Sequence, residues 1–137
     1  MAGALYRVMT NASQTVLVVE DEVLIRMSTA VALEDAGFHV LEAGNSAEAL
    51  EILAHTDDIG IVVTDVRMPG CMDGLGLVAQ LRHDYPAISI LVVSGNTAAA
   101  DAISAGAAAF IGKPYEPLGV VATVRNFAAS HHARATA

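Results

Sequence analysis

Four short apolar runs in this sequence are each followed, at once or after one residue, by side chains that could bind a metal ion or a phosphate. These are the acidic run Glu20–Glu22, the carboxylate of Asp65, the hydroxyl of Ser94 and the ammonium of Lys113, the chain's single lysine. In open parallel sheets, ligands bind outside the carboxyl ends of the strands. If the apolar runs are parallel strands, these groups therefore meet at one edge of the sheet.

The acidic groups at this edge predict a metal site. Crowded carboxylates repel one another and raise each other's pKa unless a cation lies between them. Mg²⁺ takes oxygen ligands and commonly uses one or two carboxylates with water and phosphate oxygens. We therefore expect Asp21 and Asp65 to bind Mg²⁺ directly, with Glu20 contacting the ion or its waters. Taken alone, Glu20–Glu22 is equally compatible with a solvated acidic loop.

Lys113 and Ser94 predict a site for phosphate beside the metal. A compact ammonium can neutralise a phosphoryl oxygen, and a hydroxyl can donate a hydrogen bond to another. The simpler alternatives are an ordinary surface charge for Lys113 and a turn residue for Ser94. Their shared position after apolar runs, at the end where the acids gather, favours phosphate contact.

The apolar runs have the composition of strands. The expected strands are Thr15–Val19, His39–Ala43, Ile59–Thr64, Ser89–Val93 and Ala108–Ile111. The first, third and fourth are nearly continuous in β-branched residues and Leu, as in strands buried on both faces of a parallel sheet. The second is more polar and suits an edge strand.

Helical patterns fill the gaps between these strands. The expected helices are Glu22–Ala36, Ser46–Ala54, Leu75–Tyr85, Asn96–Ala105 and Tyr115–Ser130. Gly37 follows the first helix as a C-cap residue would, and Asn45 with Glu48 resembles a capping box at the second. The apolar side chains at helical spacing are Leu24, Met27, Val31 and Ala30 in the first helix, Leu77, Val78 and Leu81 in the third, and Leu118, Val121, Val124 and Phe127 in the last.

Alternating strands and helices predict an α/β fold, with right-handed crossovers and a doubly wound, five-stranded parallel sheet. The 137 residues fit one domain, and a hydrophobic content of 54% allows a sizeable core. We expect a single domain over residues 15–130. Residues 1–14 then form an N-terminal extension, and residues 131–137 form a frayed C-terminal tail.

The charge and cysteine content exclude several classes of function. The formal net charge is −8 and the seven Lys and Arg are scattered, so the chain lacks the basic cluster that nucleic-acid binding needs. Cys71 is the single cysteine, which suits a reducing cytoplasm. No apolar run reaches the roughly 18 residues of a membrane span, and residues 1–14 do not read as a signal peptide.

Four fragments together resemble the response-regulator receiver family. They are VLVVEDE at Val16–Glu22, VVTDVRMPG at Val62–Gly70, LVVSGN at Leu91–Asn96 and FIGKP at Phe110–Pro114. Each fragment is common, but their order and spacing within one five-strand chain are specific. The resemblance covers Thr15–Phe127. It implies a flavodoxin-like sheet of order 2-1-3-4-5 with five helices, and a phosphorylated signalling switch of a two-component system rather than an enzyme.

The resemblance also implies roles for individual residues. Asp65 would accept a phosphoryl group from a histidine kinase or a phosphotransfer protein. Glu20 and Asp21 would form the acidic pair, and the Arg67 backbone carbonyl would complete the Mg²⁺ site. Lys113 would contact the phosphate. The first acid of the pair is Glu rather than the commoner Asp, a variant that is usual in the family.

Further implied roles concern the response to phosphorylation. Ser94 would be the switch hydroxyl and Phe110 the switch aromatic, and Arg67 with Asn96 would tune the loss of phosphate. The downstream protein target would bind the fourth helix, fifth strand and fifth helix, and a homodimer dependent on phosphorylation is a further option.

Two rival functions remain open. A Mg²⁺-dependent hydrolase with an aspartyl-phosphate intermediate typically has a second Asp two residues after the nucleophile, where this chain has Arg67, and the sequence has no cap domain. A phosphorelay intermediate, or a receiver-like interaction module that does not switch, is the other rival. The full set of acids, hydroxyl and lysine argues against a module that never turns over phosphate.

Overall fold

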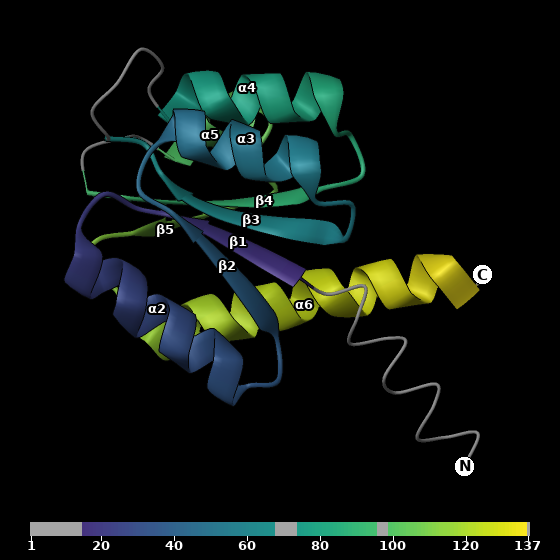
Figure 1. Ribbon diagram of the computed structural model, residues 1–137, viewed down its shortest axis with the longest axis horizontal. Helices are drawn as coiled ribbons and strands as arrows, with labels where there is room; N and C mark the ends of the chain where they lie inside the picture. Colours follow the sequence, from purple (N-terminus) through teal and green to yellow (C-terminus); the bar gives the residue numbers. More distant parts are fainter. Residues whose placement is uncertain (1–14, 68–73, 96–98, 137) are drawn as a thin grey trace.

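The computed structural model describes residues 15–67, 74–95 and 99–136, and side chains as far as Ala133. Its centre is a five-stranded, fully parallel sheet with the strand order β2-β1-β3-β4-β5 (Figure 1). The strands are β1 (Thr15–Val19), β2 (His39–Ala43), β3 (Ile59–Asp65), β4 (Ser89–Ser94) and β5 (Ala109–Gly112). The predicted order is confirmed, and the more polar β2 is an edge strand as expected.

Five helices within the described residues cover the two faces of this sheet. They are α2 (Val23–Asp35), α3 (Ser46–His55), α4 (Gly74–Asp84), α5 (Ala99–Ala105) and α6 (Pro117–Thr136). In Figure 1, α3, α4 and α5 lie above the sheet and form the upper layer, whereas α2 and α6 lie below it and form the lower layer. Among the described helices, none is both long and apolar enough to cross a membrane.

The hydrophobic core divides into one cluster for each layer because side chains alternate along a strand. In β3, Val62 belongs to the upper cluster, whereas Ile61 and Val63 belong to the lower one. Leu77, Val78 and Leu81 of α4 pack into the upper cluster, as their spacing predicts. The near-continuous apolar runs therefore reflect strands that are covered on both faces.

Two helix ends show how local sequence sets the chain direction. Gly37 follows α2 with a φ of +99°, in the left-handed region that favours glycine. Asn45 Oδ1 accepts a hydrogen bond of 2.8 Å from the Glu48 N–H at the start of α3. The predicted capping box is altered, because Glu48 Oε1 accepts from the Gly44 N–H instead of that of Asn45.

The apolar stripe of α2 does not face the core. Leu24 is 81% exposed, and Met27 and Val31 are about half exposed, whereas Thr29, Ala30 and Leu33 are buried. Of the residues at helical spacing only Ala30 is buried, and Met27, which as a methionine at helical spacing was expected in the core, is not. The small side chains of Thr29 and Ala30 line the inward face of the helix, while the bulky ones project outward.

The last helix is longer than its sequence pattern indicates. Val121 and Val124 are buried and Phe127 is half-buried, but Leu118 is exposed. The helix continues to Thr136, so the part of the expected tail up to that residue is helical. A hydrogen bond of 2.8 Å between Ser89 Oγ and His131 Nε2 ties this end of α6 to the start of β4.

Candidate functional site

Asp65 is the last residue of β3, at the carboxyl end of the central strand of the sheet. It is only 5% exposed. Its Oδ1 accepts a hydrogen bond of 3.2 Å from the Arg67 N–H, and its Oδ2 accepts one of 2.9 Å from Lys113 Nζ. Both carboxylate oxygens are therefore oriented by the protein.

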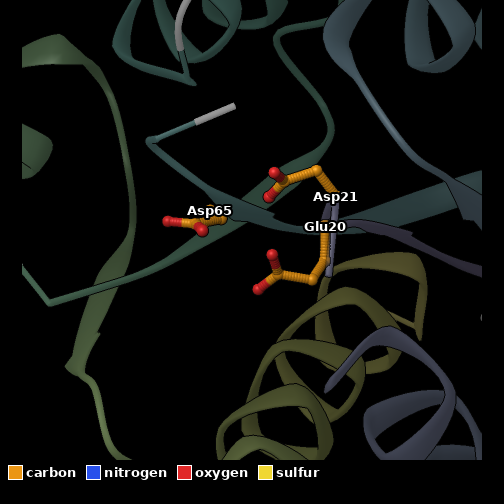
Figure 2. Close-up of side chains that lie close together, drawn as sticks. All are labelled: Glu20, Asp21 and Asp65. Atoms are coloured by element: carbon orange, nitrogen blue, oxygen red, sulfur yellow. The ribbon is translucent and has the colours of Figure 1, made fainter. Parts of the chain in front are cut away.

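The acidic loop after β1 lies beside Asp65. Glu20 is 2% exposed, and its N–H donates to the Ala43 carbonyl, which continues the pairing of β1 with β2. Its side-chain Oε2 accepts from the Glu22 N–H at 3.2 Å. Asp21 is exposed. Figure 2 shows the carboxylates of Glu20, Asp21 and Asp65 converging on one space at the strand ends.

Lys113 follows β5 and joins the two buried acids. Its Nζ donates to Glu20 Oε1 at 2.7 Å and to Asp65 Oδ2 at 2.9 Å, and the side chain is 18% exposed. The Lys113 N–H donates to the Ser94 carbonyl at 3.0 Å. The single lysine is thus held by side-chain and backbone contacts in the site where the sequence places it.

Burial and hydrogen bonding shift the pKa values of Glu20 and Lys113 in this cluster. Burial raises the pKa of Glu20, and the hydrogen bond from Lys113 opposes this only in part. Burial also disfavours the charged form of Lys113, but its hydrogen bonds to Glu20 and Asp65 outweigh that cost and raise its pKa. Lys113 is therefore a protonated, cationic donor at neutral pH.

The three acids fit a metal ion by position and by chemistry. One carboxylate oxygen each of Glu20, Asp21 and Asp65 lies within 4.8 Å of the other two. Carboxylate oxygens are hard ligands of the kind that Mg²⁺ and Ca²⁺ take. The predicted grouping of these three residues at one edge of the sheet is confirmed as geometry.

The other predicted residues lie around the same strand ends. Ser94 is the buried last residue of β4, next to Gly112 in the pairing with β5. Phe110 is half-buried and packs against the upper cluster. Arg67 is exposed two residues after Asp65. Asn96 lies outside the described residues.

Two residues that position the site were missed by the sequence analysis. The Gly74 N–H donates to the Val66 carbonyl at 2.8 Å, and a methyl group on Gly74 would collide with the backbone of Asp65 and Val66. Arg26 Nη1 donates to the Glu20 carbonyl at 2.7 Å and Nε to Glu42 Oε1 at 3.1 Å. The closely spaced Gly70, Gly74 and Gly76 were a signal for the first, but nothing in the sequence pairs Arg26 with Glu20.

Comparison with known proteins identifies a family that this chain resembles along most of its length. The family model described as "Response regulator receiver domain" matches residues 16–125. This match contains β2 to β5, all of β1 except Thr15, and every candidate site residue.

Curated relatives match the same region as part of longer proteins. The chain is 38% identical over 104 residues to an NtrX-like response regulator of Rickettsia bellii, covering 73% of this chain and 22% of that protein. It is 40% identical over 119 residues to the sensor kinase CckA of Brucella abortus, covering 84% of this chain and 12% of the kinase. The chain therefore spans less than a quarter of the length of either relative.

Solved structures share the fold. The receiver domain of NtrX from Brucella abortus superposes with a TM-score of 0.77 at 29% identity, covering 82% of this chain and 97% of that domain. A receiver domain protein from Clostridium thermocellum superposes with a TM-score of 0.79 at 25% identity, covering 86% and 96%.

Proposed function

The chain belongs to the response-regulator receiver family, and from this premise we propose that Asp65 is its phosphate acceptor and that Mg²⁺ is its cofactor. The observation that carries the proposal is the buried Asp65 carboxylate, held at 2.9 Å by the chain's single lysine and grouped with two further acids. The phosphoryl donor is the phosphohistidine of a histidine kinase or a phosphotransfer protein.

In the proposed reaction, an oxygen of the Asp65 carboxylate attacks phosphorus in line with the phosphorus–nitrogen bond of the donor. The new oxygen–phosphorus bond forms as that bond breaks, and its electron pair returns to the imidazole. Mg²⁺ held by Asp21, Asp65, the Arg67 carbonyl and Glu20 would neutralise charge on the phosphoryl oxygens. Lys113 neutralises a further oxygen, so catalysis here is positioning and charge compensation.

We propose that phosphorylation shifts the equilibrium between two conformations of the face formed by α5, β5 and α6. An acyl phosphate adds negative charge and strong acceptor oxygens, and Ser94 would donate to one of them. Phe110 would turn inward into the space released, which biases a pre-existing equilibrium. The downstream protein, or a second copy of the chain, would then bind the face formed by α5, β5 and α6. We propose that phosphoryl transfer and binding take place in the cytoplasm, because a single cysteine suits a reducing compartment.

The acceptor is tested by phosphorylating the chain with acetyl phosphate and Mg²⁺. Intact-mass analysis should show one acid-stable, base-labile phosphoryl group on the parent and none on Asp65→Asn. A chelator should prevent modification of the parent. The matched control is Asp101→Asn, which changes an exposed acid of α5 and should be modified like the parent. Equal modification of Asp65→Asn would sink the assignment.

We also propose that Arg67 and Asn96 set the lifetime of the phosphorylated state. Loss of phosphate needs a water in line on the side opposite Asp65, and the exposed Arg67 side chain follows the acceptor by two residues. It can cover the phosphoryl group or pair with it, and neither effect aligns a water. Asn96 could hold a water but carries no charge to act as a base.

Arg67→Ala should speed the loss of phosphate a few-fold, equivalent to about 1 kcal/mol or less of barrier. The measurement is the decay of the phosphorylated protein after removal of the donor, at fixed Mg²⁺. Decay in Arg67→Ala that is unchanged or slower would show that Arg67 does not slow hydrolysis.

A further inference from the structure

A hydrogen bond outside the acidic cluster joins α2 to the loop that follows β5. The hydroxyls of Thr29 and Tyr115 are 2.7 Å apart, and either one can be the donor. Thr29 is 1% exposed on the inward face of α2, and the Tyr115 ring packs against the lower cluster. The two residues are 86 positions apart in the sequence, so this contact belongs to the tertiary structure alone.

Each residue of this hydrogen bond belongs to a segment that adjoins the site in sequence. Tyr115 follows Lys113 by two residues in the same loop, whereas α2 begins immediately after the acidic loop that carries Glu20 and Asp21. The bond therefore links the segment that carries the ammonium to the helix that continues from the acids. Lys113 itself is held on its other side by the bond from its N–H to the Ser94 carbonyl.

A surface groove separates these two segments elsewhere. It is lined on the α2 side by Leu24, Ile25 and Ser28, and on the opposite side by Lys113, Pro114 and Pro117. Thr29 and Tyr115 also line this groove, so their hydroxyls bridge its two walls. The bridge therefore fixes the spacing between the loop that carries Lys113 and α2 at this groove.

We infer that Tyr115 is a positioning residue for Lys113: its hydroxyl, bonded to Thr29, fixes the loop so that Lys113 Nζ stays between Glu20 and Asp65. This role concerns phosphoryl transfer and rests on the function proposed above. It differs from the role of Lys113 itself, because the Tyr115 hydroxyl bonds Thr29 rather than the acids and acts through the loop.

The chemistry of the pair suits a permanent link. Burial raises the pKa of the Tyr115 hydroxyl, and the bond to Thr29 opposes this only in part. The hydroxyl is therefore uncharged and able to donate or accept throughout the neutral range. Phe at position 115 would keep the ring in the lower cluster and remove only the link. A purely structural hydrogen bond is the competing explanation, and it predicts a loss of stability with no effect that depends on Lys113.

The first test uses the fact that Lys113 is the single lysine. The metal-free parent and variants are treated with limiting acetic anhydride, and peptide mass analysis follows acetylation of Lys113 with the N-terminal amine as internal reference. In Tyr115→Phe and in Thr29→Val, Lys113 should be acetylated about three- to ten-fold faster, since a lost hydrogen bond allows a looser loop. Thr29→Ser retains the hydroxyl and should react like the parent.

The matched control is Tyr85→Phe, which removes the hydroxyl of a half-buried tyrosine that packs against the upper cluster. It should leave acetylation of Lys113 unchanged. Parent-like labelling of both Tyr115→Phe and Thr29→Val would overturn the inference, as would equally fast labelling in Tyr85→Phe.

The second test measures the rate of phosphorylation by acetyl phosphate. Tyr115→Phe should lower the maximal rate about three- to ten-fold, because small misplacements of catalytic groups reduce rates strongly, and should leave the half-saturating Mg²⁺ concentration unchanged. In a Lys113→Ala background the same substitution should cause no further loss, whereas a general loss of structure would slow both backgrounds equally. Additive losses in the two backgrounds would contradict positioning through Lys113.

The two tests separate this inference from the proposed function. If the parent is phosphorylated at Asp65 and Tyr115→Phe matches it in rate and in labelling, the positioning role fails and the function stands. If the parent is never phosphorylated at Asp65, the proposed function fails, and the labelling result alone then decides whether the hydroxyl link holds Lys113.

Discussion

The upper cluster and the carboxyl end of the sheet are both buried, but they are built from opposite kinds of side chain. In the upper cluster, Leu77, Val78 and Leu81 of α4 pack against the strands with no exposure. At the carboxyl end, Glu20 and Asp65 are buried almost as deeply and share one ammonium. Burial of the apolar side chains stabilises the folded state. Burial of the two acids instead has a desolvation cost, which their ion pairs with Lys113 offset only in part.

The two regions therefore contribute differently to the protein: the upper cluster stabilises the fold, and the strand ends offer charge to a ligand. Apolar burial is insensitive to which ion or ligand is present, so it holds the sheet and layers in every functional state. Two buried acids with one partly buried cation leave a surplus of negative charge at the strand ends. That surplus favours an added cation, and the buried surroundings strengthen its interaction with the acids.

The largest effect is expected from a cavity in the upper cluster. Leu81→Ala should lower the free energy of unfolding by about 2–5 kcal/mol, since it removes buried methyl groups and leaves a void. Chemical denaturation with and without Mg²⁺ checks this, and the deficit should be the same in both. Leu118→Ala, at an exposed position of α6, is the matched control and should change stability by about 0.5 kcal/mol or less. A deficit that Mg²⁺ reduces would show that the stability supplied by the upper cluster depends on the ion.

An intermediate effect is expected from removing Lys113, the partly buried cation between the two acids. Lys113→Ala should fold, but should lose about 1–3 kcal/mol of stability in the absence of metal, because Glu20 and Asp65 then lack their partner. Added Mg²⁺ should narrow this deficit, since an ion bound by the acids supplies the missing charge and stabilises the folded state.

The control for this variant is Arg125→Ala, which removes an exposed cation of α6. Its stability should respond to Mg²⁺ as the parent does. If the Lys113→Ala deficit were independent of Mg²⁺, the charge at the strand ends would not explain it.

The smallest effect is expected at the edge of the acidic loop. Glu42→Gln weakens the 3.1 Å ion pair with Arg26, whose partner carboxylate is partly exposed, so the change in unfolding free energy should be about 0–1 kcal/mol. The bond from Arg26 to the Glu20 carbonyl remains, and the half-saturating Mg²⁺ concentration should be unchanged. A loss above that of Lys113→Ala would show that Arg26, rather than Lys113, organises the acids.

Much of the fold was predictable because its signals are local. The short apolar runs placed all five strands to within one residue at each end, and Asn45 placed the start of α3. Position after a strand also grouped Glu20, Asp21, Asp65 and Lys113, because all strands of a parallel sheet present their carboxyl ends at one edge.

The orientation of α2 was not predictable from its periodicity. Leu24, Met27 and Val31 share a side at helical spacing, as a core stripe does, yet they face outward. Periodicity shows which residues share a side, but not which side the sheet will cover. The end of α6 was also not predictable from local sequence. His131, in the last turns of this helix, bonds Ser89 of β4, which lies 42 positions away in the chain.

The order of strands and helices, the apolar strands of the core and the chemical groups at the strand ends followed from the sequence alone, because each depends on residues that are near one another in the chain. Only the tertiary structure decided that Lys113 bridges Glu20 and Asp65, that Arg26 holds the acidic loop and that Tyr115 meets Thr29. The Lys113 and Tyr115 contacts join residues separated by 48 to 93 positions. Such pairs form only when strand pairing and helix packing have brought distant segments together, and no local pattern records them.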